Sequence, residues 1–84
     1  MDNKKLTIIE PHENNPKEKQ LARLRIYAGL TQKALAENSG VSVRMIEQYE
    51  QGKKDINKAS AETVYKLSQA LGCSMEDLIK KQNA

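Results

Sequence analysis

Phenylalanine and tryptophan are absent from this 84-residue chain, and three tyrosines are its only aromatic residues. The core must therefore be built mainly from aliphatic side chains. Two prolines and four glycines leave long stretches without a helix breaker, which favours helices. A chain of this length forms at most one domain and buries only about 60% of its unfolded-state surface.

Cysteine and histidine occur once each, as Cys73 and His12. A single cysteine excludes an intrachain disulfide, and the two residues lack zinc-ligand spacing, so we expect no cofactor. No apolar run is long enough to span a membrane, and no signal-peptide apolar region follows Met1. We expect a cytoplasmic protein. Without a Gly-rich phosphate loop or a carboxylate pair in a predicted cleft, we do not expect an enzyme.

The positive charge is unevenly distributed. The chain carries 14 Lys and Arg against 11 Asp and Glu, a net charge of +3. Residues 1–15 contain more acidic than basic side chains, so the excess of positive charge lies in residues 16–84. This distribution is compatible with binding to nucleic acid but does not prove it.

Residues 1–15 are predicted to form a flexible N-terminal arm. The segment is polar except for Leu6–Ile9, and Pro11 interrupts any helix. A lone strand over Leu6–Ile9 would not be stable by itself. We expect the domain to cover residues 16–81 and residues 82–84 to fray.

The first two helices are predicted from their caps. The first helix is predicted to start at Pro16. Asn15 is its N-cap, Pro16 suits the first helical position, and Glu18 completes a capping-box pattern. It ends at Gly29, with an apolar stripe of Leu21, Leu24 and Ala28. Thr31 then caps a short second helix over residues 32–38, and a tight turn follows in which Gly40 is free to take a positive φ.

Three more helices are predicted after this turn. Ser42 caps a helix over residues 43–51, which Gly52 ends, and residues 53–59 read as a polar, basic loop. Ser60 begins the fourth helix, and Ser74 with Asp77 caps the fifth. Tyr49 and Cys73 are expected to pack in the core rather than to stack on a base or to perform redox chemistry.

Two short helices around a glycine turn form a helix-turn-helix unit, which is a generic motif. The surrounding detail is more specific. The chain resembles the phage repressor/Cro-like (XRE) family in Leu30-Thr31-Gln32, Leu35-Ala36, Ser39-Gly40-Val41-Ser42, Ile46, Tyr49-Glu50-Gln51-Gly52 and Leu71-Gly72-Cys73-Ser74. The resemblance covers about residues 19–79. It implies an all-α, five-helix lambda-repressor-like bundle of bacterial or phage origin that binds double-stranded DNA.

The resemblance also implies that helix 43–51 lies in the DNA major groove. The matching base-contacting positions are Ser42, Val43, Arg44 and Gln48. The chemistry suits these roles, because arginine can donate two bonds to guanine and glutamine can pair with adenine. Val43 offers an apolar surface to a thymine methyl group. As surface residues without a ligand, Arg44 and Gln48 would be ordinary solvated side chains.

Phosphate contacts are expected around the same helix. Gln32 matches a phosphate-contacting glutamine of the family, at a helix N-terminus whose amides also favour an anion. The further candidates are Thr31, Gln51, Lys53, Lys54 and Lys58. Any single one of these lysines could equally belong to a solubility patch, whereas the group as a whole favours phosphate contact. Glu47 and Asp55 interrupt the basic surface and either discriminate between sequences or weaken non-specific binding.

Arg25 and Glu50 each lie on an apolar face of a predicted helix, where a charge needs a partner. In the family, an arginine and a glutamate at the matching positions form an ion pair beneath the recognition helix. We therefore expect a structural ion pair between Arg25 and Glu50.

The function implied by the resemblance is that of a small transcriptional regulator, usually a repressor. A homodimer would read a palindrome with half-sites about 10 bp apart, through contacts from the loop after residue 52, the last helix or the arm. An alternative is an antitoxin-like or other interaction module, whose Leu6–Ile9 segment adds to the sheet edge of a partner protein. A third is a domain that has lost DNA binding.

Overall fold

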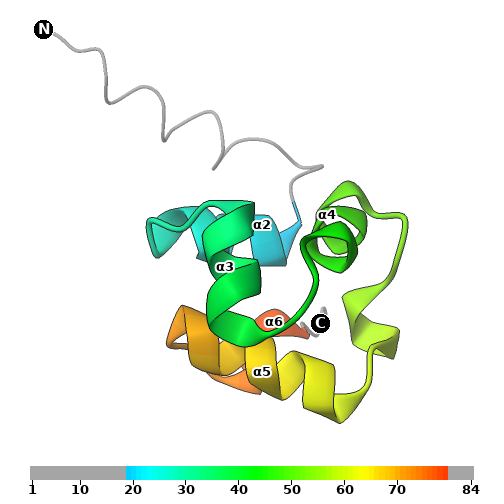
Figure 1. The fold of residues 1–84 in the computed structure, drawn as a ribbon. Coiled ribbons are helices and arrows are strands. Elements are labelled where there is room, and N and C mark those ends of the chain that lie inside the picture. The colour runs from blue at the N-terminus through cyan, green and yellow to red at the C-terminus, as the bar shows by residue number, and fades with distance from the viewer. Residues whose placement is uncertain (1–18, 80–84) are drawn as a thin grey trace, which may run out of the picture.

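The helices of the domain follow one another through short turns. The computed structural model describes residues 19–79, in which no strand occurs. The elements are α2 (Gln20–Tyr27), α3 (Gln32–Ser39), α4 (Val43–Gln51), the 3₁₀ helix η2 (Ile56–Lys58), α5 (Ala61–Leu71) and α6 (Met75–Leu78) (Figure 1). The predicted all-α, five-helix fold is confirmed. The arm and both ends of the predicted domain lie outside the described residues.

Hydroxyl side chains fix the starts of four helices. Each accepts a hydrogen bond from the backbone N–H three residues further on, at 2.9–3.1 Å. The four caps are Thr31, Ser42, Ser60 and Ser74. The Ser74 N–H also donates to Asp77 Oδ2 at 3.1 Å, which completes a capping box. These four predicted starts are confirmed, because each bond satisfies a backbone donor that the helix leaves unpaired.

The first helix does not run unbroken from Pro16 as predicted, and residues 15–18, which carry its predicted cap, lie outside the described residues. Lys19 has an extended backbone (φ −77°, ψ 155°), so α2 begins at Gln20. The chain makes two long-range contacts at this point. The side chain of Lys19 lies against Gly52, and Gln20 Nε2 donates to the Asp77 carbonyl at 3.1 Å. These contacts fix the start of α2 against the rest of the domain.

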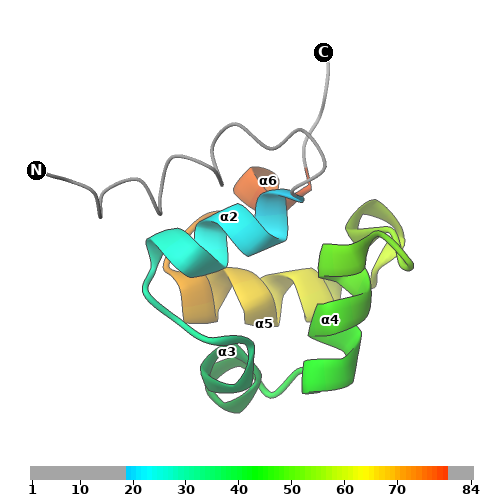
Figure 2. The same cartoon turned by 90° about the horizontal axis from the view of Figure 1, so that it is seen from above.

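The core draws on all five α-helices and on the turn between α3 and α4. α3 packs on α4 and α5, α5 packs on α6, and α2 packs on α4 and α6 (Figures 1 and 2). The buried members of the core cluster are Leu21, Leu35, Val41, Ile46, Tyr49, Val64, Leu67 and Leu78. The core is thus aliphatic apart from Tyr49. Cys73 packs against it, as predicted, whereas Ala28 at the end of α2 is exposed.

The segment after α4 is more ordered than the predicted polar loop. It contains η2, whose cap Asp55 accepts from the Asn57 N–H at 2.9 Å. The short helix lets Ile56 pack against the core. Ala59 packs against the core as well. These two apolar side chains anchor the stretch through contacts that periodicity within a short segment cannot reveal.

No described helix is long and apolar enough to cross a membrane.

Candidate nucleic-acid interface

The turn between α3 and α4 sets the two helices against each other. Gly40 takes a left-handed conformation (φ 82°) at the end of α3, which a residue with a side chain adopts only at a cost. Val41 then enters the core, and its N–H donates to Ser39 Oγ at 3.0 Å. The buried valine and the bonded turn therefore fix how α4 leaves α3.

α4 has one buried face and one face open to solvent. Ile46 and Tyr49 are buried in the core. On the other side, Val43 is 39% exposed, Arg44 is exposed, and Gln48 one turn later is half-buried. Helical spacing places positions 43, 44, 47, 48 and 51 on a single face. The structure thus brings the predicted base-contacting residues of α4 together, with the exposed Ser42 at its N-cap.

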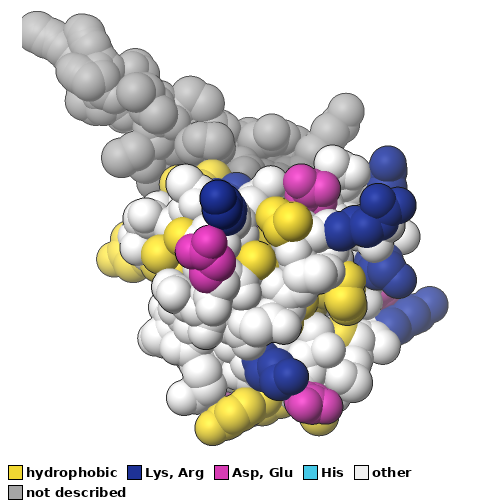
Figure 3. Space-filling model, in the orientation of Figure 1, with side chains coloured by type: hydrophobic (Ala, Val, Ile, Leu, Met, Phe, Trp, Pro, Cys, Tyr) yellow, Lys and Arg dark blue, Asp and Glu magenta, His cyan; other side chains and the backbone are white. Residues whose placement is uncertain are grey.

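Basic side chains lie around the far end of α4. Lys53, Lys54 and Lys58 are all exposed. The N–H groups of Lys53 and Lys54 both donate to the Gln48 carbonyl, at 2.9 and 3.1 Å, which folds this stretch back onto the helix end. Figure 3 shows Lys and Arg side chains gathered on the side where α4 and the following segment lie. The arrangement creates a cationic rim beside the polar face of α4.

Negative charge on this surface is limited. One carboxylate oxygen of Asp55 accepts the hydrogen bond that caps η2, and Glu47 is half-buried on α4. Gln51 and Thr31 are exposed. Thr31 Oγ1 accepts from the Ala34 N–H, so its hydroxyl hydrogen stays available to donate to an anion.

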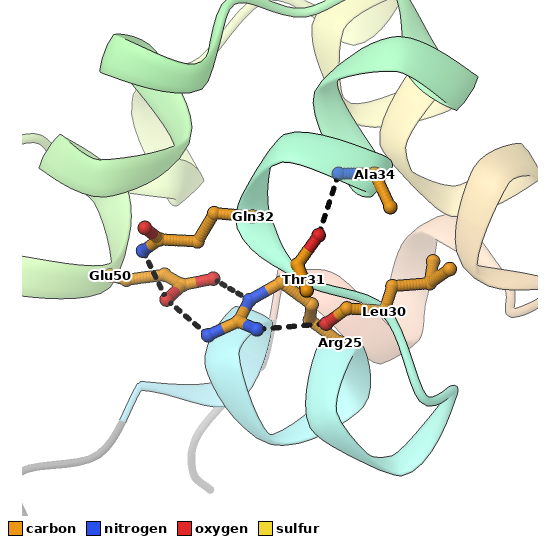
Figure 4. A network of polar contacts seen from close by, with 6 residues as sticks. All are labelled: Arg25, Leu30, Thr31, Gln32, Ala34 and Glu50. Carbon is orange, nitrogen blue, oxygen red and sulfur yellow. Dashed lines mark hydrogen bonds and ion pairs between the residues drawn. The ribbon is translucent and has the colours of Figure 1, made fainter.

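The expected ion pair between Arg25 and Glu50 is present. Arg25 Nε lies 2.6 Å from Glu50 Oε2, and Nη2 lies 3.0 Å from Oε1. The two side chains are only 15% and 8% exposed. Arg25 Nη1 also donates to the Leu30 carbonyl at 2.9 Å (Figure 4). One guanidinium group therefore joins α2, the start of α3 and α4.

Gln32 belongs to the same network, which sequence reasoning missed. Its Nε2 donates to Glu50 Oε1 at 2.9 Å (Figure 4). A carboxylate can accept more hydrogen bonds than one arginine donates to it. This spare capacity of Glu50 was the signal for a further donor. The bond holds the Gln32 amide at the N-terminus of α3 and leaves its carbonyl oxygen and second N–H for another partner.

Among residues 19–79, no group of three or more His, Cys, Asp or Glu side chains could hold a metal ion. The polar groups of the interface are instead donors that suit DNA. Amides, hydroxyls and lysines match phosphate oxygens, and arginine and glutamine on a helix of suitable width match base edges in the major groove.

Comparisons with known proteins agree with this geometry. A family model described as helix-turn-helix matches residues 21–78, which is well over half of the chain. Neither the curated proteins nor the solved structures gave a significant match. The chain therefore belongs to the helix-turn-helix family of the XRE, Cro/C1 type, a non-enzymatic family of DNA-binding domains.

Proposed function

We propose that the protein binds double-stranded DNA sequence-specifically and regulates transcription as a small repressor. The observation that carries the proposal is the solvent-facing side of α4, where Arg44 and Gln48 stand on a helix whose other side is buried with Ile46 and Tyr49. A helix anchored in this way presents its polar side chains in a fixed arrangement, which selective reading requires.

Side chains in the first turns of α4 contact the bases. Arg44 donates to O6 and N7 of a guanine, and Gln48 pairs with N6 and N7 of an adenine. Val43 contacts a thymine methyl group, and Ser42 lies at the point where the helix enters the groove. Glu47, between them, accepts from a cytosine N4 or repels sequences that offer no donor there.

Phosphate contacts position this helix. Thr31 and Gln32 hold one backbone phosphate at the N-terminus of α3, where helix amides and the dipole favour an anion. Gln51, Lys53, Lys54 and Lys58 follow the backbone beyond α4. These contacts supply affinity and register but carry no sequence information.

Repression follows from occupancy of promoter DNA, in the compartment that holds the DNA. One domain reads about half a site, so we propose a two-fold dimer on a palindrome with half-sites about 10 bp apart. The alternative, a module that binds a partner protein through Leu6–Ile9, rests on residues outside the described range and stays a prediction.

Selection of binders from a random duplex library at physiological salt tests the proposal. Enrichment of a palindromic motif is expected, and sedimentation on that duplex should show two protomers. Enrichment of a motif without symmetry would contradict the dimer. A folded protein that enriches no motif would contradict sequence-specific binding and favour a protein-interaction module.

A further inference from the structure

A pocket lined by both polar and apolar side chains lies where the start of α2 meets the end of α4. Its volume is about 420 Å³. Its lining includes Lys19 and Gln20 from the start of α2, and Lys54, Asp55 and Asn57 from the segment after α4. Tyr49 also contributes. The pocket brings together two lysines that are far apart in the sequence and have no ion pair among the described contacts.

The side chain of Lys19 lies beside Gly52 at this pocket. Its Cε lies 3.2 Å, and its Nζ 3.7 Å, from where a Cβ of Gly52 would be. Gly52 is the C-cap of α4 in a left-handed conformation (φ 82°), so the absence of a side chain makes room for the lysine stem. The ammonium group therefore sits beside the end of the helix that carries the proposed base-reading residues.

The charges of the pocket favour an anion. Lys19 and Lys54 contribute two positive charges against one negative charge from Asp55, and one oxygen of that carboxylate is already engaged by the Asn57 N–H. Lysine acts as a point charge toward phosphate and needs no fixed planar geometry. The C-terminal end of α4 adds a partial negative charge of about half a unit. It opposes an anion but is smaller than the net positive charge of the three side chains, which therefore still favours an anion.

We propose that Lys19 and Lys54 form a phosphate-binding site at the end of α4, which takes a phosphate of the DNA backbone. The inference rests on the proposed function and deepens it. It extends the backbone contact from the segment after α4 to the first residue before α2. Because phosphate contacts are blind to sequence, Lys19 strengthens binding to operator and random DNA alike.

The test measures the salt dependence of DNA affinity for the full chain and for Lys19→Gln, Lys54→Gln and Lys66→Gln. Glutamine removes the charge and keeps the first three carbons of the lysine stem, with an amide atom in place of Cε. Each lost phosphate contact should lower the slope of log K against log [salt] by about 0.9 on random duplex. Lys66, paired with Glu62 on α5 at 3.1 Å, is the control and should leave the slope unchanged.

The outcomes separate this site from the proposed function. If Lys54→Gln lowers the slope and Lys19→Gln does not, the site is wrong while the DNA-binding function stands. A wild-type affinity without salt dependence would overturn the function itself. A thermal melt identifies a purely structural Lys19, whose loss would lower the melting temperature but not the slope.

A second arm distinguishes a DNA phosphate from a free one. The free protein is titrated with inorganic phosphate at constant ionic strength, and the amide resonances of Gly52 and Lys54 are followed by NMR. No saturable shift is expected at millimolar phosphate. A saturable shift that Lys19→Gln abolishes would overturn the assignment to the DNA backbone and make this a site for a free anion.

Discussion

Glu50 holds Gln32 at the N-terminus of α3, with Gln32 Nε2 donating to Glu50 Oε1 at 2.9 Å. The same oxygen accepts from Arg25 Nη2 at 3.0 Å. A single carboxylate on α4 thus engages a cation on α2 and an amide on α3. The network links the proposed phosphate contact to the helix that carries the proposed base-reading residues.

Glu50→Ala should destabilise the domain by about 3 kcal/mol. This is the lower end of the range of about 3–5 kcal/mol for breaking one partner of a buried pair, because Arg25 is still 15% exposed. Urea denaturation measures the change. Glu62→Gln removes the exposed pair with Lys66 and should cost less than about 0.5 kcal/mol. Equal losses in the two variants would contradict the structural role of Glu50.

Gln32→Ala should weaken DNA binding without changing its salt dependence. The side chain is neutral, so its loss releases no additional counterion. The lost hydrogen bond to Glu50 should lower the free energy of unfolding by about 1 kcal/mol. Fluorescence anisotropy at several salt concentrations measures both affinity and slope. If the variant binds DNA with the affinity of the wild type, Gln32 does not contact the DNA.

Arg44→Ala should cost about 1–3 kcal/mol of affinity for the selected operator and relax sequence preference at one position. Arg44 is exposed on α4, so stability should change little. Lys54→Ala is the matched comparison, because it should weaken all sequences alike and lower the salt slope by roughly one. If both variants behave identically on operator and random DNA, the assignment of the base-reading residues is wrong.

Gly52→Ala and Gly40→Ala should destabilise the domain by similar amounts. Both glycines have φ near 82°, a conformation that costs about 1–2 kcal/mol for a residue with a Cβ. At Gly40 nothing lies within 4 Å of the new methyl group, whereas at Gly52 it meets Lys19 Cε at 3.2 Å, near the end of a flexible, exposed side chain that can move aside. Chemical denaturation of both variants measures the two losses. A much larger loss at Gly52 would mean that the Lys19 side chain is fixed against it.

Cys73 should make stability fall at alkaline pH. Burial, and then the negative charge of Asp77, raise the pKa of the Cys73 thiol above its ordinary value of 9.0. As pH rises through that value, the unfolded chain loses the thiol proton while the folded chain keeps it, so folding becomes less favourable. The stability difference between the wild type and Cys73→Ala should therefore shrink from about pH 8 to about pH 10. A difference that does not change with pH would contradict this.

Much of the fold was predictable because its signals are local. A hydroxyl N-cap such as Ser42 and a terminal glycine such as Gly52 act within one helical turn, and the bounds of α4 follow from them. The ion pair was predictable for a different reason. Arg25 and Glu50 each lie on an apolar helix face, where a charge needs a partner, and the family resemblance implied that they pair with each other. The base-reading and phosphate assignments follow from the family resemblance and stay predictions.

The sequence by itself determined where four helices begin, that the core is aliphatic, and which family the domain resembles, because caps, glycine turns and apolar spacing act over a few residues. Only the tertiary structure decided where α2 starts, that Ile56 anchors η2, that Gln32 bonds to Glu50, and that Lys19 covers Gly52. These features depend on side chains that meet across helices, and their contacts follow from packing geometry, which sequence spacing does not encode.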